Sequence, residues 1–265
     1  PPLGRVAEMS DPWTPSSEQA PYRVDAAGPR TPAIVELRLL PVGAPLGYRP
    51  GQYILLEDEE GAITPRSYSV ANPPRPDGEI SLLVTRVPGG QASTWIHRLT
   101  AGEAVRVSGP YGTFVDGTAG MAPALFLAAG SGLAPIRALL EAALTSRRRE
   151  TLTLILSARG EGDVIDHERF ARRQQREPRF RFIRTLTREA GPPPRGRIPE
   201  ILADLVDGHD GLDGHDVFVA GASGFVTECA AAAEALGAAR AHVHTEVFYD
   251  EPRSWTGAAP PTTGA

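Results

Sequence analysis

The pattern of apolar residues changes near residue 120, and this change limits the folds that the chain can adopt. Upstream, apolar and polar residues alternate in short segments at about 33–40, 53–57, 66–70 and 79–86, with Gly and Pro between them. Alternation with a period of two is typical of half-buried strands, and Gly and Pro favour tight turns. The first part of the chain therefore predicts a small antiparallel sheet, closed into a barrel.

Downstream of this change, apolar strands alternate with helices. Residues 124–129 are all apolar, 130–132 form a glycine turn, and 136–144 have the spacing of a buried helix. The order recurs, with strands expected at 152–156, 180–187 and 217–220, and helices at about 166–176, 198–206 and 225–236. Strands that alternate with helices predict a parallel, doubly wound sheet.

The length of the chain, 265 residues, suits two domains, because domains usually run roughly 100 to 200 residues. We expect a disordered arm at 1–20, the β-barrel domain at 21–118, the α/β domain at 119–250 and a flexible tail at 251–265. The arm and the tail are rich in Pro and lack both periodicity and apolar mass, so neither is expected to dock.

Composition excludes several classes of protein. Hydrophobic residues make up 41% of the chain and charged residues 22%, and no apolar run approaches the roughly 20 residues of a membrane span. The net charge of −5 argues against nucleic-acid binding, although all 27 basic residues are Arg. The N-terminus has no apolar signal core. We therefore expect a cytoplasmic protein with no nucleic acid or membrane as a partner.

Cys229 is the one cysteine in the sequence. It excludes an internal disulfide and an iron-sulphur cluster held by four cysteines of this chain. Its place well inside a predicted helix favours a small buried hydrophobic residue over a catalytic thiol. We expect no metal site in this chain, so an iron-sulphur cluster would have to belong to a partner.

The most informative polar segment runs from Arg66 through Ser67 and Tyr68 to Ser69, between two predicted strands. Arg offers a planar fork for phosphate oxygens, Tyr a flat ring that can stack, and Ser a compact hydroxyl. Together they suit a flat ring system that carries a phosphate. The alternative is an ordinary half-buried strand with alternating side chains.

Two glycine turns precede predicted helices. Gly89 and Gly90 lead into a helix at 92–99, and free N–H groups at such a helix start attract a pyrophosphate, although a plain turn is the alternative. The turn at 130–132 follows an apolar strand, an arrangement that brings a dinucleotide phosphate to a helix N-terminus. Pro135 stands in the third slot of that motif, so the usual glycine fingerprint is not matched.

Three motifs occur in order across the two predicted domains: Arg-x-Tyr-Ser at 66–69, Gly-Pro-Tyr-Gly-x-Phe at 109–114 and Gly-x-Gly-x-Ala-Pro at 130–135. The chain thereby resembles the ferredoxin-NADP reductase superfamily over about residues 20–250, and within it the flavin-dependent oxygenase reductase components and bacterial flavin reductases. The resemblance implies a FAD-binding barrel followed by an NAD(P)H-binding domain.

The resemblance also implies roles for the barrel residues. Arg66 would bind the flavin phosphate, Tyr68 would lie against the isoalloxazine ring, and Ser69 would sit at the reactive ring nitrogen, with Ser67 in the same cofactor-binding motif. The rest of the implied flavin site flanks the ribityl chain and cradles the pyrophosphate, and consists of Val84, Arg86, Gly89, Gly90 and Ser93.

In the second domain, the residues that the resemblance places at the nucleotide are Gly130, Ser131, Gly132, Pro135 and Gly221. Glu246 and Phe248 stand where the family commonly has a Glu and an aromatic residue near the flavin, so they join Ser69 as implied catalytic residues. Two departures are Ala220, which replaces the usual cysteine beside the nicotinamide, and Ala222, which replaces a Pro. Hydride transfer could then be slower, or be positioned by other groups.

Arg188 and Arg197 fall in a stretch that resembles the segment with which some bacterial members bind the extra phosphate of NADPH, and Arg159 is a third candidate. Two Arg near one ribose would favour that dianion. We therefore expect NADPH in preference to NADH. The alternative is that these are solvated loop charges.

The resulting hypothesis is an enzyme, a FAD-dependent NAD(P)H oxidoreductase that passes electrons to a separate iron-sulphur ferredoxin or oxygenase component. One alternative is a flavin reductase that releases reduced flavin to another enzyme. Another is a sensor of flavin or nucleotide without turnover, to which Ala220 lends some support.

Overall fold

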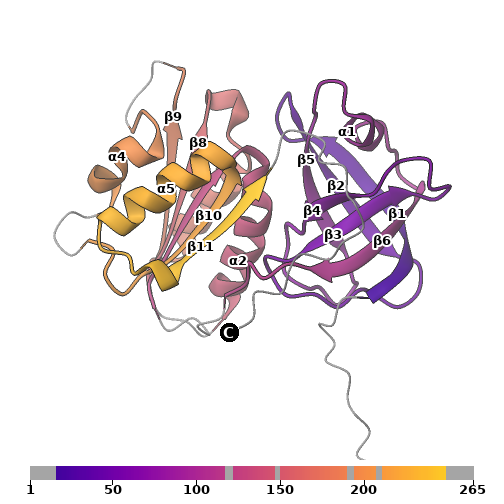
Figure 1. Cartoon of the computed structure of the whole chain (residues 1–265), viewed down its shortest axis with the longest axis horizontal. Coiled ribbons are helices and arrows are strands. Elements are labelled where there is room, and N and C mark those ends of the chain that lie inside the picture. The colour runs from indigo at the N-terminus through magenta and orange to yellow at the C-terminus, as the bar shows by residue number, and fades with distance from the viewer. Residues whose placement is uncertain (1–15, 117–121, 147–149, 190–193, 207–210, 249–265) are drawn as a thin grey trace, which may run out of the picture.

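The computed structural model describes residues 16–116, 122–146, 150–189, 194–206 and 211–248. They form two domains, a β-barrel and a parallel sheet covered by helices, which lie side by side (Figure 1). The predicted tail at 251–265 and most of the predicted arm lie outside the described residues. In the described part of the chain, no helix has both the length and the apolar character that crossing a membrane requires.

The barrel is a six-stranded antiparallel sheet in the order β4-β3-β6-β1-β2-β5. Its two outer strands approach each other, because Val70 bridges Leu82 and the Ala71 N–H donates to the Ser81 carbonyl oxygen at 2.7 Å. Its elements are β1 (Ser16–Pro29), β2 (Ile34–Pro41), β3 (Tyr53–Asp58), β4 (Arg66–Ser69), β5 (Ile80–Thr85), α1 (Gln91–Ile96) and β6 (Ala104–Tyr111).

Alternation along the strands builds the barrel core. Ile54 and Leu56 on β3 point inward together with Val105 and Val107 on β6, and all four side chains are almost fully buried. Because successive side chains on a strand point to opposite faces, Leu55 and Arg106 between them point away from the barrel core and are only partly buried.

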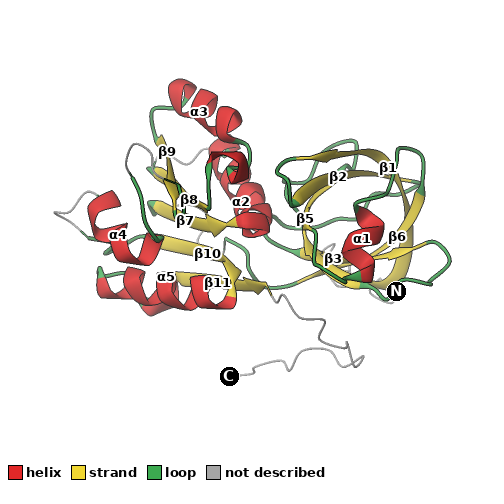
Figure 2. Ribbon diagram, turned by 90° about the horizontal axis from the view of Figure 1, so that it is seen from above, coloured by secondary structure: helices red, strands yellow, loops and turns green. Residues whose placement is uncertain are grey.

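The second domain has a five-stranded parallel sheet in the order β11-β10-β7-β8-β9. Figure 2 shows α2 and α3 on one face of this sheet and α4 and α5 on the other. The elements are β7 (Ala124–Ala129), η1 (Gly130–Gly132), α2 (Leu133–Thr145), β8 (Leu152–Ala158), η2 (Glu161–Asp163), α3 (His167–Arg176), β9 (Phe180–Leu186), α4 (Ile198–Leu205), β10 (Asp216–Ala222), α5 (Ser223–Ala235), η3 (Arg240–His242) and β11 (Val243–Phe248).

The two domains share buried apolar surface. Ile34, Leu83 and Phe114 come from the barrel and its exit segment, yet they belong to the same buried cluster as Leu139 on α2. The close approach of Gly51 to this exit segment needs a glycine, since a Cβ there would lie 1.8 Å from the Phe114 carbonyl oxygen. The packing therefore fixes α2 against the barrel.

The two-domain fold predicted from the sequence is confirmed, with one local correction. β1 begins at Ser16, and Ser16 and Ala20 pair with β6, so the expectation of disorder is wrong for residues 16–20. The pairing groups are backbone atoms, which explains why side-chain periodicity did not reveal them. β6 continues to Tyr111, because Tyr111 pairs with Tyr53.

Candidate active site

The carboxyl ends of the parallel strands lie toward the barrel (Figure 2). β7 runs directly into η1, while β10 and β11 end at Ala222 and Phe248. In a doubly wound sheet, ligands bind outside these ends where the strand order reverses. That point lies between β7 and β10, because the helices that follow them, α2 and α5, cover opposite faces. The predicted nucleotide turn is therefore at the usual ligand position.

Ser69 and Glu246 meet across the gap between the domains. Ser69 ends β4 of the barrel, Glu246 lies near the end of β11, and the Ser69 hydroxyl Oγ donates a hydrogen bond to Glu246 Oε1. Ser69 is buried, with 7% of its surface exposed. The sequence proposed both as catalytic residues, and the structure brings them into direct contact.

The surroundings of Glu246 change its acidity. Burial raises the pKa of its carboxyl group, the bond from Ser69 lowers it, and the balance leaves the pKa at about 7, against an ordinary 4.5. Burial disfavours the charged form of a carboxyl group because the charge loses its contact with water. Glu246 can therefore take up or release a proton near neutral pH, as a group in acid-base catalysis must.

Two tyrosines flank this contact, and the sequence did not single them out as site residues. Tyr53 on β3 lies opposite Ser69 on β4, and its ring lies 5.6 Å from the ring of Tyr111. Burial raises the pKa of Tyr53, and the electrostatic interactions with Glu246 and Tyr111 raise it further. Strand register opposite Ser69 was the signal that would have identified Tyr53.

The remaining residues of the Arg66–Ser69 motif lie along β4. Ser67 is exposed, and Arg66 is half-buried with Nη1 donating to the Pro65 carbonyl oxygen at 3.2 Å. Tyr68 packs against the barrel core, and burial raises its pKa to about 12. Neighbours on a strand alternate in direction, so Ser69 faces the second domain while Tyr68 faces the barrel.

The segment after β5 supplies a pre-shaped turn. Ser93 Oγ accepts a bond from the Val87 N–H at 3.1 Å and can donate to the Gly90 carbonyl oxygen at 3.2 Å, so its hydroxyl fixes the turn from within. Gly89 has a positive φ of 74° and open space beside its Cα. Arg86 is exposed, but the Val84 side chain is 1% exposed, so a ligand could reach Val84 only through its main chain.

The nucleotide turn touches both domains. Thr85 Oγ1 at the end of β5 donates to Ser131 Oγ at 2.9 Å. On its other side the turn lies so close to β10 that a Cβ at Gly132 would lie 2.3 Å from the Ala220 carbonyl oxygen. Gly130 has a φ of 55°, and Pro135 is buried in the first turn of α2. The glycines at 130 and 132 are thus explained by conformation and by close approach.

The end of β10 packs directly against this turn. Ala220 is fully buried and pairs in register with Glu246, while a Cβ at Gly221 would lie 2.9 Å from the Phe225 ring. Phe248 is half-buried and lies opposite Ala222. Cys229 is buried in α5, and burial raises its pKa to about 12, which keeps it a protonated thiol in the core.

Arg159 and Arg188 follow neighbouring strands and lie side by side. The Arg188 N–H donates to the Arg159 carbonyl oxygen at 2.9 Å, and both side chains are exposed at the carboxyl ends of β8 and β9. Glu189 lies between these segments, where its Oε2 accepts from the Glu161 N–H at 2.9 Å. The sequence did not single out Glu189, although it directly follows Arg188.

Arg197 has a different environment from Arg159 and Arg188. It precedes α4, and its Nη2 lies 2.5 Å from Glu228 Oε2 on α5, with Glu200 at 3.9 Å. Its charge is therefore already paired within the domain. The structure brings two of the three predicted arginines together and gives the third a structural partner.

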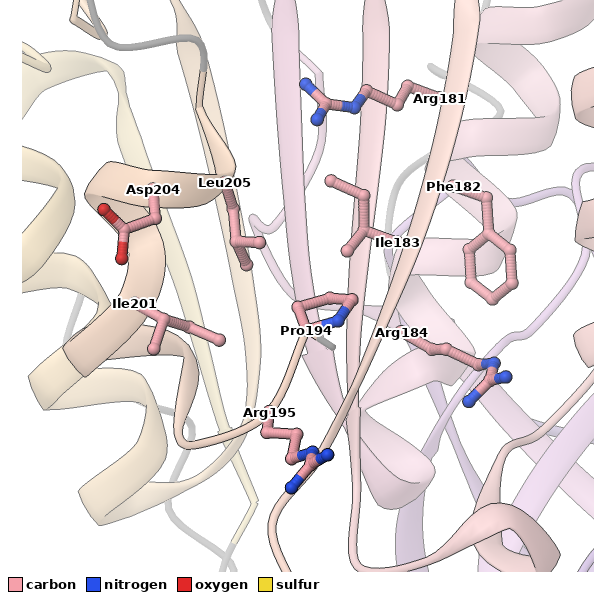
Figure 3. A pocket seen from close by; sticks show the side chains of 9 residues that line it. All are labelled: Arg181, Phe182, Ile183, Arg184, Pro194, Arg195, Ile201, Asp204 and Leu205. Atoms are coloured by element: carbon pink, nitrogen blue, oxygen red, sulfur yellow. The ribbon is translucent and has the colours of Figure 1, made fainter. Parts of the chain in front are cut away.

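A groove of about 620 Å³ lies beside the edge strand β9 (Figure 3). Arg181 and Arg195 stand at its two ends, with Ile183 and Pro194 between them, and Asp204 comes from α4. It shares no lining residue with the Ser69–Glu246 site. Within the described ranges, no group of three His, Cys, Asp or Glu side chains is placed to hold a metal ion.

Comparisons with known proteins agree with this geometry. The model of the oxidoreductase FAD-binding domain matches residues 31–115, and that of the oxidoreductase NAD-binding domain matches residues 126–231. The first range contains the Arg66–Ser69 motif and the second contains η1. The domain models therefore assign FAD binding to the barrel domain and NAD binding to the α/β domain.

Relatives over most of the chain are reductases. The chain is 33% identical over 236 residues to ferredoxin-NADP reductase B of Sorangium cellulosum. The match covers 85% of this chain and 96% of that protein. It is 31% identical over 223 residues to reductase component 1 of the Comamonas sp. terephthalate 1,2-dioxygenase. This match covers 83% of this chain and 66% of that protein.

Solved structures show the same fold. The cytochrome P450 reductase GcoB of Amycolatopsis matches with a TM-score of 0.78 and 28% identity, over 87% of this chain and 70% of that one. A ferredoxin NADP⁺ reductase from Neisseria gonorrhoeae, solved with FAD and NADP, matches with a TM-score of 0.76 and 21% identity, over 88% of this chain and 100% of that one. The chain therefore belongs to the ferredoxin-NADP reductase superfamily, and it is an NAD(P)H-dependent flavoprotein reductase.

Proposed function

We propose that this reductase takes electrons from NADPH through FAD and passes them to a separate iron-sulphur protein, a ferredoxin or an oxygenase component, in the cytoplasm. Bound FAD would supply the chemistry that links a two-electron hydride donor to one-electron transfer. The observation that carries the proposal is the contact between Ser69 and Glu246, because it joins the FAD-binding domain to the NAD-binding domain at one point.

The residues present suit these cofactors. Within the described residues, the Arg66 guanidinium donates through Nη1 to the Pro65 carbonyl oxygen, and its other N–H donors could bind a phosphate. The Ser93 hydroxyl holds the turn from Gly89 to Ser93 by bonding to the Gly90 carbonyl oxygen, and η1 brings backbone groups to the carboxyl edge of the sheet. Arg66 and the turn would hold FAD, whereas η1, Pro135 and Gly221 would hold the nicotinamide cofactor.

Ser69 and Glu246 would control a proton at this site. The Ser69 hydroxyl donates to Glu246 Oε1, so a proton on Ser69 Oγ is ordered by the carboxylate. Glu246, with a pKa of about 7, can hold a proton on its carboxyl group or release it to water, and the Ser69 hydroxyl donates to the carboxylate that remains. Phe248, two residues further on β11, would shield the same edge from water.

The preference for NADPH rests on Arg159 and Arg188. Their backbones are hydrogen bonded and both guanidinium groups are exposed beside the sheet edge, where two cations would favour the extra phosphate. We leave Arg197 out of this proposal because Glu228 already pairs its charge.

The electron acceptor is inferred from two facts. The chain contains a single cysteine, so it cannot hold a four-cysteine cluster, and its relatives include a ferredoxin-NADP reductase and a dioxygenase reductase component. A separate iron-sulphur protein would supply the cluster.

Anaerobic stopped-flow spectroscopy tests the function as a whole. The purified protein should be yellow, bleach on mixing with NADPH, and recover its colour when oxidised ferredoxin is added. Absence of bleaching would refute the proposed reductase function. Loss of the flavin on gel filtration, with reduction of added free flavin, would replace the proposal with a flavin reductase that releases its product.

A further inference from the structure

Arg137 is a buried cation that spans the two domains. It lies on α2, five residues after the nucleotide turn, and only 1% of its surface is exposed. Its Nε donates to the Ala71 carbonyl oxygen at 2.7 Å, and its Nη2 donates to Glu36 Oε1 at 2.5 Å. Ala71 and Glu36 belong to the barrel, so one guanidinium group holds two barrel segments.

The third nitrogen of Arg137 is held by its own domain. Nη1 donates to Asp166 Oδ2 at 2.7 Å. Asp166 precedes α3 and has a φ of 56°, in the left-handed region that Asp tolerates better than most residues. All three guanidinium nitrogens therefore have acceptors, and the planar fork fixes their relative directions.

The charges around Arg137 are balanced. Burial alone would raise the pKa of Glu36, but Arg137, Ser81 and Arg30 together lower it to about 2, so Glu36 is ionised at neutral pH. Three cations, Arg137, Arg30 and Arg169, thus face three carboxylates, those of Glu36, Asp166 and Glu141.

Stability alone is a weak reason to bury such a cluster. Charges lose hydration on burial, and apolar residues of similar volume often give equal or greater stability. What the ionic cluster adds over an apolar contact is direction, because each bond has a preferred length and angle.

The position of the cluster connects it with both sides of the candidate active site. Ala71 follows Ser69 by two residues, and α2 starts where η1 ends. A shift of Arg137 would therefore move Ser69 and the nucleotide turn relative to each other. A misplacement of about 1 Å can slow a reaction by roughly 100-fold, even when the changed residue is far from the reacting atoms.

We propose that Arg137 is a positioning residue: its guanidinium holds α2 against the strand that leaves Ser69, and thereby sets the separation between the nicotinamide and the flavin. The inference rests on the proposed function. Arg137 takes no part in the chemistry and contacts the barrel through Ala71, Glu36 and Ser81.

The test compares Arg137→Met with Arg179→Met. Arg179 is a suitable control because it also contacts the end of α2, through the Leu144 carbonyl oxygen at 2.9 Å, and pairs with Glu177 at 3.2 Å, all within one domain. For Arg137→Met we expect unchanged FAD content and NADP⁺ affinity, with the limiting rate of flavin reduction by NADPH lowered about 10- to 100-fold. For Arg179→Met that rate should stay at the wild-type value.

Hydrogen exchange of the proteins without FAD gives a readout independent of activity. Peptides covering 69–83 and 133–145 should exchange faster in Arg137→Met than in the wild type, and not in Arg179→Met. If Arg137→Met does not fold, Arg137→Lys serves instead, because lysine keeps the charge but loses the fork; the rate should then fall about 3- to 10-fold.

The outcomes separate this inference from the proposed function. A wild-type protein that NADPH does not bleach would overturn the proposed function. A wild-type protein that bleaches, with Arg137 variants that bleach equally fast or show unchanged exchange at the interface, would overturn only the positioning role. An equal loss of rate in Arg179→Met would also overturn it, since the effect would then belong to α2 in general.

Discussion

Ser69 and Glu246 are 177 residues apart in the sequence, and the hydroxyl of one donates to the carboxylate of the other. They come from different domains, so the pair forms only when β4 and β11 are brought together. Neither domain alone contains both groups, which makes the contact a direct report on domain docking.

Replacing Glu246 by alanine should slow flavin reduction by NADPH without releasing FAD. The change removes the acceptor of the Ser69 hydroxyl and the proton-holding group, and acid-base groups of this kind contribute roughly 100- to 10,000-fold. Stopped-flow reduction and the flavin-to-protein absorbance ratio measure the two effects. Glu234→Ala, an exposed position on α5, is the control. Wild-type kinetics in Glu246→Ala would remove Glu246 from the site.

The pH dependence of stability should also report Glu246. Its folded pKa of about 7 lies above the ordinary 4.5, so between these values the folded state holds a proton that the unfolded state has released. The free energy of unfolding should therefore fall as pH rises through this window, with a contribution on the order of 3 kcal/mol.

Urea unfolding of the wild type and Glu246→Gln measures this contribution. The stability difference between the two proteins should change between about pH 4.5 and about pH 7, and be constant on either side. Ser69→Ala should raise only the upper limit of the window, because the Ser69 bond lowers the folded pKa of Glu246 and the unfolded value is unchanged. A difference that is independent of pH would show that Glu246 titrates normally.

Arg66→Ala should lose most of its bound FAD while the fold stays intact. One charge-assisted phosphate contact is worth roughly 1.5 to 3 kcal/mol, which corresponds to about one to two decades in affinity. Arg75→Ala is the matched control, because Arg75 lies in the same domain with its charge paired to Asp77 at 2.7 Å. Equal flavin content in the two variants would contradict the role of Arg66.

Arg188→Ala and Arg159→Ala should each lower the ratio of kcat/KM for NADPH to that for NADH, by roughly 10-fold or more, since each removes a charge-assisted bond to the extra phosphate. Arg197→Ala should leave the ratio unchanged, because Glu228 holds that guanidinium. Steady-state kinetics with both coenzymes measures it. If the wild type uses the two coenzymes equally, Arg159 and Arg188 do not bind the extra phosphate and are solvated surface charges.

Gly132→Ala should destabilise the second domain. Its Cβ would lie 2.3 Å from the Ala220 carbonyl oxygen, so the backbone of η1 or β10 would have to move, at a cost of about 1 to 3 kcal/mol. Gly224→Ala in α5 is the control, because a Cβ there meets nothing within 4 Å. Thermal unfolding compares them, and equal midpoints would show that η1 adapts.

Periodicity predicted most of the fold because each element buries a face. The all-apolar strand β7 and its glycine turn were recognisable without neighbours. The start of β1 was not, because residues 16–20 are held by backbone pairing with β6, and the sequence there shows no apolar alternation.

The candidate site was predictable where motifs are local and unpredictable where partners are distant. Ser69 and Glu246 were each identified, but their contact depends on how the domains dock. Arg197 is of a residue type that binds phosphate, and only the position of Glu228 on another helix shows that its charge is paired. Arg137 gave no signal, since an Arg in an apolar helix is buried only when acceptors from other segments surround it.

The order of the barrel strands determines where the barrel can open locally. β4 and β5 are the first and last strands of the sheet, and they meet near the Val70–Leu82 bridge instead of along a full ladder. The motif on β4 and the turn after β5 thus stand on opposite sides of a seam. A ligand bound to both segments would hold the two edge strands together. Hydrogen exchange of the backbone amides of β4 and β5 should then slow more than that of the central strands β6 and β1.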